Sequence, residues 1–459
     1  MIKPNKGMKT FFVIWLGQLA SMIGSGLIGF ALAVWIYDQT GQATPFALTA
    51  LFSTVPRILL SPIAGAVSDR WNRKRIMLIS DSLSGLITIA TAILLATGQM
   101  QVWMVYLFSF LGSIFASFQQ PAYSASIVML VPKEQLTRAN SLVQLGEAIE
   151  ATLTPILAGA LFGIIGMRGV LLIDVVTYLI AIVTLILVFI PQPERTDLGE
   201  TRQKTVFRDI VFGWRYLLER RGLLGLLLYF AGVNFLANIS SVLIGPLVLS
   251  FSSAASMGFA QTMMGVGMLG GSFLMSLWGG PKKNRVKTIV GAISLSSLGF
   301  IIAGFRSSLA FIAIGMFVLL FFIPFGSGPS SALFAAKVAP DVQGRVFSTR
   351  SMISLSMMPV AFLMSGIMAD KVFSPLLLEG GVLADTFVGG LLGVGPGRGI
   401  GLMFICSGVF LLLISGLAYL NPRIRNIETE IPDAVPDQVE KASEQEDEDE
   451  KRRAIESVG

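Results

Sequence analysis

The chain has 459 residues, of which 53% are hydrophobic and only 14% are charged, and its mean hydropathy is +0.74. A soluble fold of this length exposes too much surface for such a composition, so a soluble globular protein is excluded. The formal charge of +6 is the sum of a basic main part and an acidic tail, which from residue 426 onward has twelve acidic and four basic residues. With a single cysteine, Cys406, an intrachain disulfide is excluded.

Long apolar runs recur along the chain, each close to the ~20 residues with which an α-helix crosses a bilayer. They are continuous rather than alternating, which favours helices over the strands of a barrel. The first run is too long for the core of a signal peptide and is therefore interpreted as a span. We expect an all-α polytopic membrane protein with twelve transmembrane helices near residues 11–37, 44–67, 76–97, 102–130, 139–165, 170–190, 223–250, 258–280, 287–304, 308–334, 343–370 and 399–420.

Positive charge sorts to one side of these spans. If the N-terminus is cytoplasmic, 29 of the 34 Lys and Arg residues fall in cytoplasmic segments, four (Arg168, Arg306, Lys371 and Arg398) fall outside, and Arg57 lies within a span. Cytoplasmic loops of membrane proteins are enriched in Lys and Arg. We therefore predict a multi-pass protein of the cell inner (plasma) membrane with both termini in the cytoplasm.

The polar segments divide the chain further. Residues 1–10 form a cytoplasmic N-terminus, 11–190 and 223–420 hold six spans each, 191–222 form a cytoplasmic linker, and 421–459 form an acidic tail that we expect to be disordered. Within the linker, apolar residues at helical spacing alternate with arginines, which indicates an amphipathic helix on the inner leaflet. An ordinary solvated linker is the alternative.

An internal repeat supports two equivalent halves. Pro121, Pro132 and Gln135 recur as Pro329, Pro340 and Gln343, each 208 residues later, at the cytoplasmic ends of the fourth and tenth spans. Two pseudo-symmetric six-helix halves follow, and transporters built in this way bind their substrate between the halves.

The loop between the second and third spans carries a recognisable motif. Residues 65–75 read Gly-Ala-Val-Ser-Asp-Arg-Trp-Asn-Arg-Lys-Arg. This resembles the G-x-x-x-D-R-x-x-R-R/K loop of the major facilitator superfamily and lies at the matching place. The resemblance implies the major facilitator fold and a cytoplasmic gate in which the Asp latches the two halves against span eleven. Gly65 would permit close approach of helices, and the basic residues would lie among anionic headgroups. The gate residues are Gly65, Asp69, Arg70, Arg73, Lys74 and Arg75.

The sequences around Pro121 and residues 344–348 (Gly-Arg-Val-Phe-Ser) resemble the macrolide-efflux type branch, which also contains siderophore and other drug exporters. The chain departs from the superfamily's drug–proton antiporters in two places. Gly112 stands where many of them have an Arg in span four, and the glycine-rich signature of span five survives only in residues 154–159.

Polar side chains form stripes at helical spacing on the spans that the family places around its central cavity. Small and hydroxyl residues also serve close helix packing, which is the alternative for the serines. The candidate cavity residues are Gln18 and Ser25 in span one, Ser113, Ser117 and Gln120 in span four, and Asn234 and Asn238 in span seven.

Ionised groups inside a membrane usually mark a transport pathway or a partner. The sequence has no histidine, so carboxylates must carry any transported protons, and desolvation raises the pKa of a carboxyl toward neutrality. Glu150 is the first choice because its depth matches that of Arg57, and Glu147 is the second. A structural role is favoured for Asp81 and Asp174, which remain candidates.

These features predict a secondary active exporter of hydrophobic drugs or small metabolites, driven by proton antiport with alternating access. The alternatives are a dedicated exporter of an endogenous metabolite such as a siderophore, and a non-transporting receptor or scaffold. No phosphate-binding loop, metal-ligand cluster or soluble catalytic domain is present in the sequence, so we expect neither an enzyme nor a cofactor or metal site. The expected partners are a small-molecule substrate, protons and the lipid bilayer, without nucleic acid, and the protein is expected to be a monomer.

Overall fold

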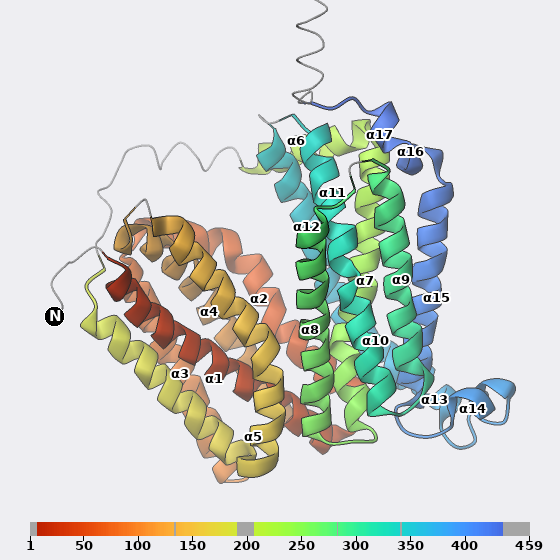
Figure 1. The fold of residues 1–459 in the computed structure, drawn as a ribbon. Coiled ribbons are helices and arrows are strands. Elements are labelled where there is room, and N and C mark those ends of the chain that lie inside the picture. Colours follow the sequence, from red (N-terminus) through yellow and green to blue (C-terminus); the bar gives the residue numbers. More distant parts are fainter. Residues whose placement is uncertain (1–6, 133–134, 191–205, 282, 340–341, 435–459) are drawn as a thin grey trace, which may run out of the picture.

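The computed structural model describes residues 7–132, 135–190, 206–281, 283–339 and 342–434. Over these residues the chain forms helices and connecting loops, with no strand. The helices gather into two bundles that stand side by side, the first running from red to yellow and the second from green to blue (Figure 1). The expected all-α, two-half architecture is confirmed.

The first half contains six spans in five helical segments. α5 has 52 residues, which would measure ~78 Å as one helix, far more than the ~30 Å hydrocarbon core. Gly166, with φ 64° and ψ −173°, breaks α5 into two spans, as the predicted boundary at 165–170 requires. The segments are α1 (Met8–Thr40), α2 (Ala43–Arg70), α3 (Arg73–Ala96), α4 (Val102–Leu130) and α5 (Leu136–Leu187).

The second half repeats this plan with more interruptions. Its tenth span is split at Phe322, where Pro324 has no backbone N–H to continue the hydrogen-bond ladder. Its eleventh span ends in a π-helix, η4, which leads into the longest loop of the half. The segments are α7 (Arg221–Leu249), α8 (Ala254–Trp278), α9 (Arg285–Phe305), α10 (Leu309–Phe321), α11 (Ile323–Lys337), α12 (Gln343–Met368), η4 (Ala369–Phe373), α13 (Ser374–Leu377), α14 (Phe387–Leu392) and α15 (Arg398–Leu420).

The number of spans agrees with the sequence. Ten helical segments of the described chain are long and apolar enough to cross a bilayer. One of these is α5, which holds two spans, and α8 completes the set of twelve.

The two ends of the molecule are distinguished by short helices. The α6 face carries α6 (Val206–Glu219), α16 (Pro422–Arg425) and α17 (Ile427–Glu430), and the α14 face carries α13 and α14 (Figure 1). α6 lies within the predicted amphipathic linker and packs against α12 and α7. Its Leu217 is buried, whereas Trp214 and Leu218 are exposed. Residues 191–205 of the linker lie outside the described residues.

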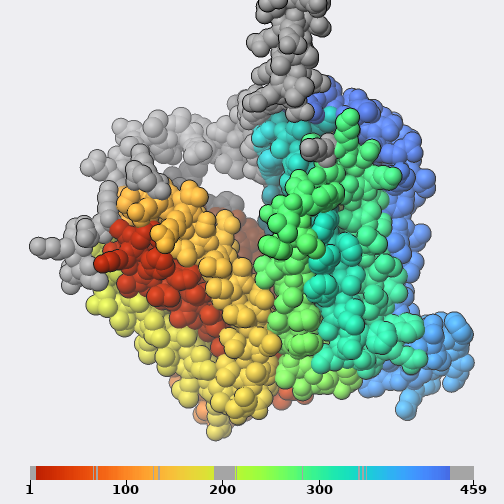
Figure 2. Space-filling model, in the orientation of Figure 1, coloured from red at the N-terminus to blue at the C-terminus, as the bar shows by residue number. Residues whose placement is uncertain are grey.

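The halves meet near the α14 face and diverge toward the α6 face, where Figure 2 shows a gap between them. The contacts join α5 to α8 and α2 to α12. Small residues permit this approach: a Cβ added at Gly159 would lie 2.8 Å from the carbonyl oxygen of Ala254. The interior between the halves is therefore open at one end and closed at the other.

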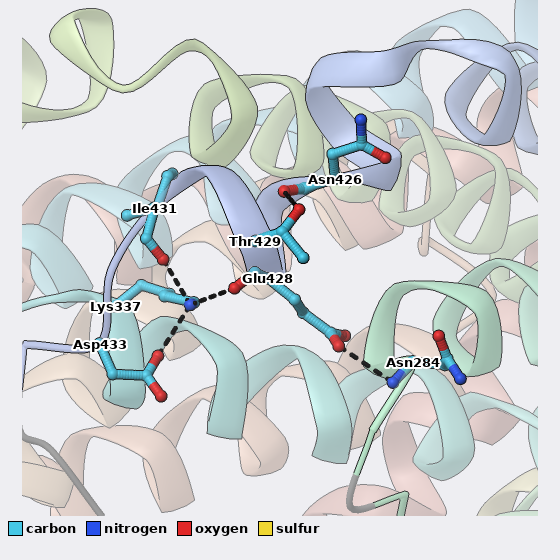
Figure 3. Close-up of polar contacts among 7 residues, drawn as sticks. All are labelled: Asn284, Lys337, Asn426, Glu428, Thr429, Ile431 and Asp433. Atoms are coloured by element: carbon cyan, nitrogen blue, oxygen red, sulfur yellow. Dashed lines mark hydrogen bonds and ion pairs between the residues drawn. The ribbon is translucent and has the colours of Figure 1, made fainter. Parts of the chain in front are cut away.

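The C-terminal region differs from the disordered tail expected from residue 421 onward. Residues 421–434 are ordered and run across the α6 face of the second half, and we call them the C-terminal strap (Figure 3). Ile424 and Ile427 are buried, and Glu428 accepts hydrogen bonds from the backbone N–H groups of Asn284 (3.0 Å) and Val286 (3.1 Å) at the start of α9. The sequence did not reveal these anchors, because most of the acidic residues that indicated a disordered tail lie in residues 435–459, outside the described residues.

Lys337, at the end of α11, binds the C-terminal strap. It is 6% exposed, donates to the carbonyl oxygen of Glu428 (2.8 Å) and to that of Ile431, and forms an ion pair with Asp433 (2.8 Å) (Figure 3). Removing the partners of a buried charge costs ~3–5 kcal/mol. The strap is therefore part of the folded second half.

We predict that truncation after Ala434 leaves stability unchanged, whereas truncation after Arg425 lowers the free energy of unfolding by ~3 kcal/mol, because Lys337 is left buried without a partner. Melting curves of the purified protein in detergent test this. Adding Lys337→Met to the shorter chain should restore much of the loss. Equal stability of the two truncated chains would show that the strap contributes nothing.

Candidate transport site

A polar network lies inside the first half, between α1, α3 and α4. Gln18 is 4% exposed; its Nε2 donates to Asp81 Oδ2 (3.1 Å), and its Oε1 accepts from Gln119. Asp81 is also 4% exposed. The side chain of Gln18 is thus engaged within the first half, whereas its place on the span-one stripe predicted that it lines the central cavity. The helical period locates a polar face but not the neighbour that covers it.

A second buried carboxyl lies between α3 and the later part of α5. Asp174 is fully buried; its Oδ2 accepts from Thr88 Oγ1 (2.7 Å), and its Oδ1 has no hydrogen-bond partner among the described residues. Nearby, Ser25 of α1 shares a hydrogen bond of 2.9 Å with the hydroxyl of Tyr178. In the described part of the chain no cation forms an ion pair with Asp81 or Asp174. Both acids therefore depend on hydrogen bonds inside the first half.

Glu150, Glu147 and Arg57 occupy more open positions. Arg57 lies at the middle of α2 and Glu150 near the middle of the first span in α5. Arg57 and Glu147 are exposed, and Glu150 is half-buried against α1, with Oε1 3.3 Å from where a Cβ on Gly26 would lie. Arg57 and Glu150 do not form an ion pair in this structure. Because charges at this depth are costly in lipid, we expect the exposed side chains of Arg57 and Glu147 to face the gap between the halves.

The remaining cavity candidates separate into two groups. Ser113 and Ser117 are buried; Ser113 donates to the carbonyl oxygen of Ser53 on α2 (2.6 Å), and Ser117 donates to that of Ser113 (2.6 Å), as close helix packing predicts. Gln120 is exposed. Asn234 and Asn238 are half-buried on α7, where Asn238 Nδ2 donates to the Asn234 carbonyl (2.7 Å).

The gate motif at the α6 face has a structural role within the first half. Arg73 donates to the carbonyl oxygen of Ala125 near the end of α4 (3.2 Å). Lys74 Nζ donates to the carbonyl oxygens of Ile186 (3.0 Å) and Val188 (2.7 Å) at the end of α5. Lys74 therefore caps the C-terminus of α5, whereas the basic cluster was expected among headgroups. Of Arg73, Lys74 and Arg75, whose side chains are described, only Arg75 is exposed.

The expected close helix approach at Gly65 is not seen, because a Cβ added there would have no atom within 4 Å. The α6 face is the end at which the halves diverge, which accounts for the open space. The side chains of Asp69 and Arg70 lie outside the described residues, so the family's latch stays a prediction.

Several contacts could not be predicted from the sequence because they join positions that are distant along the chain. Gln119, Thr88 and Tyr178 complete the polar network in the first half. Arg398, expected in an outer segment, is 4% exposed and donates to the carbonyl oxygens of Gly304 (2.9 Å) and Phe305 (3.0 Å) at the end of α9. A charged residue at the edge of a span is the only sequence signal for such a cap.

Among the described residues, no group of three or more acidic, His or Cys side chains gathers where it could hold a metal ion. What the arrangement provides is a space between two helix bundles, open at one face. Together with the membrane-spanning helices, this architecture is typical of a polytopic membrane transporter.

The chain belongs to the Major Facilitator Superfamily, whose sequence profile matches residues 14–362. It is 29% identical to macrolide efflux protein A of Streptococcus pyogenes over 377 residues, covering 81% of this chain and 92% of the relative. It is 24% identical to the enterobactin exporter of Escherichia coli over 312 residues, covering 68% and 70% of the two chains. The resemblance to the superfamily and to its macrolide-efflux branch is confirmed.

Solved structures agree on the fold. A bacterial homologue of the human lysosomal transporter Spinster, in an inward-facing and unoccupied conformation, superposes with a TM-score of 0.66 at 16% identity, covering 94% of this chain and 99% of the other. A bacterial homologue of the iron transporter ferroportin, also inward-facing, gives a TM-score of 0.61 at 14% identity, covering 89% and 98%.

We predict that Lys74→Met destabilises the first half by ~1 kcal/mol, because two carbonyl groups at the end of α5 lose a charged donor. Arg75→Met is the matched control, since it removes the same charge from the next residue of the motif, where the side chain is exposed. Thermal unfolding of both variants is the measurement. Equal melting temperatures would mean that Lys74 serves only as a surface charge.

Proposed function

We propose that this transporter is a secondary active exporter of hydrophobic drugs or small metabolites, with its α6 face in the cytoplasm and the structure in an inward-open state. Three observations support this. The α6 face bears most of the Lys and Arg of the loops, the gap between the halves opens toward it, and the macrolide efflux protein is similar over most of its length. A substrate dissolved in the inner leaflet or cytoplasm would enter through this gap.

Proton antiport is the proposed energy source, with Glu150 as the carrier. The observation that carries the proposal is the position of this carboxyl: mid-depth in its span and half-buried against α1, with Glu147 one turn away on the same helix. A half-buried carboxyl can gain and lose a proton as the halves rearrange, whereas Asp81 and Asp174 are enclosed within one half.

The cycle follows from alternating access. In the inward-open state Glu150 releases its proton to the cytoplasm, and substrate enters the gap. Closure of the α6 face and opening of the α14 face release the substrate outside, where Glu150 is protonated again. The neutral carboxyl returns without substrate, so each outward step for substrate is tied to an inward step for a proton.

A dedicated exporter of an endogenous metabolite such as a siderophore is the second candidate. It is favoured by the 24% identity to the enterobactin exporter. The two candidates differ in the selectivity of the cavity rather than in mechanism, so a substrate panel separates them.

We predict that Glu150→Gln abolishes export driven by a pH gradient in proteoliposomes while downhill substrate exchange continues, because Gln mimics the protonated acid at nearly constant volume. Glu379→Gln, in an exposed loop of the α14 face, is the control and should transport normally. If Glu150→Gln retains gradient-driven transport, Glu147→Gln and Asp81→Asn are examined next. Full transport by all three would rule out proton coupling through these carboxyls.

For the substrate, we expect expression in an efflux-deficient host to raise the inhibitory concentration of macrolides at least fourfold, with no rise for Glu150→Gln. Secretion of a catecholate siderophore by the same host, deprived of its own exporter, is measured in parallel. Restored secretion with unchanged macrolide susceptibility would favour the dedicated exporter over the drug exporter.

A further inference from the structure

A carboxylate of the second half sits on the start of a helix of the first half. Asp370, in η4 directly after α12, accepts hydrogen bonds from the backbone N–H groups of Ala43 (Oδ1, 2.9 Å) and Thr44 (Oδ2, 2.6 Å). These are the first two residues of α2, and such N–H groups have no partner within their own helix. The contact joins positions 327 and 326 residues apart and bridges the two halves at the α14 face.

α2 does not supply this cap itself. The residue at its N-cap position is Gln42, whose side chain makes no capping hydrogen bond. Asp370 fills that role from the other half, with both carboxylate oxygens and a negative charge at the positive end of the helix dipole. Charge-assisted hydrogen bonds of this type are among the stronger ones in proteins.

The surrounding seam is close-packed. Gly366, one turn before Asp370, lies so near α2 that a Cβ there would be 2.6 Å from the Cα of Thr44. Ala43 and Ala47 are 2% and 1% exposed. The carboxylate therefore stands at the edge of a close-packed seam, and opening of the α14 face would separate it from α2.

Among the described residues, the other side-chain hydrogen bond that joins the halves is uncharged. Thr262 Oγ1 on α8 lies 3.4 Å from the carbonyl oxygen of Thr152 on α5, a longer bond. Elsewhere in the α5–α8 contact, Gly159 and Gly258 lie close to backbone atoms of the opposite helix, which fixes distance but carries no charge.

We propose that Asp370 is a latch between the halves: its bonds to the N-terminus of α2 stabilise the state in which the α14 face is closed, and they break each time that face opens. Asp370 thus sets the balance between the two states of the transport cycle without touching substrate. The proposal depends on the movement of the halves and not on which substrate or ion is carried.

The test measures the two states directly in the full-length protein in lipid nanodiscs. In a Cys406→Ala background, spin labels at positions 99 and 379 report the distance between the halves at the α14 face, and labels at 137 and 283 report it at the α6 face. The variant is Asp370→Asn, which keeps the size of the side chain but loses the charge. Asp385→Asn is the matched control, because it removes the same charge from an exposed residue of the loop between α13 and α14, at the same face.

We expect Asp370→Asn to raise the ratio of α14-open to α14-closed molecules about fivefold. The amide nitrogen of Asn cannot accept a hydrogen bond, so the variant loses the charge and one of the two bonds, and this factor corresponds to a typical hydrogen bond. The α6-face distance should shorten in the same fraction of molecules, and Asp385→Asn should match the wild type. Unchanged distances in Asp370→Asn would overturn the proposal.

A second variant distinguishes a latch from a cap that merely stabilises α2. Adding Gln42→Asp to Asp370→Asn provides a cap from within the first half, on backbone already in the extended conformation that N-caps adopt. We expect it to restore the melting temperature but not the closed population. Recovery of the closed population by Gln42→Asp would show that Asp370 acts only on helix stability, and the latch would be rejected.

Discussion

This structure depends on how the unpaired backbone groups at the ends of its helices are satisfied. Twelve long helices satisfy their backbone groups internally along the span, as a bilayer requires, but each leaves unpaired N–H groups at one end and unpaired carbonyls at the other. Charged side chains from other helices satisfy several of these ends: Lys74 at the end of α5, Arg398 at the end of α9, Glu428 at the start of α9 and Asp370 at the start of α2. Each cap lies at one of the two faces of the bundle.

The sequence predicted the parts of the fold that follow from composition and periodicity. The length and apolarity of the runs predicted the spans, and the 208-residue repeat predicted two halves, because both properties are local or self-similar. The caps could not be predicted, because they join residues such as Asp370 and Ala43 across more than 300 positions. The same limit affected the C-terminal strap, in which Ile427 and Glu428 find their partners only after the second half has folded.

The candidate site also combines features that the sequence predicted with features that it could not predict. The cost of burying polar groups drew attention to Glu150, Asp81 and Gln18, and helical spacing placed polar residues on shared faces. It did not distinguish a side chain facing another helix of the same half from one facing the gap. Gln18 is engaged by Asp81 and Gln119, whereas Glu147 and Arg57 are exposed. That distinction depends on which helices cover each face of α1, α2 and α5 after folding.

Contacts within each half and contacts between the halves differ in strength, as alternating access requires. Contacts within a half must persist while the halves move, and two of them are deeply buried. Lys337 and Arg398 are 6% and 4% exposed, and loss of partners from a buried charge costs ~3–5 kcal/mol. The contact between halves must break in every cycle, and the Asp370 cap, at a half-buried position, is of the class worth ~1 kcal/mol. An energy of that size biases the two states by about fivefold without trapping either. A buried ion pair in place of Asp370 and α2 would bias them by a factor of a hundred or more and would slow the cycle that the fold exists to perform.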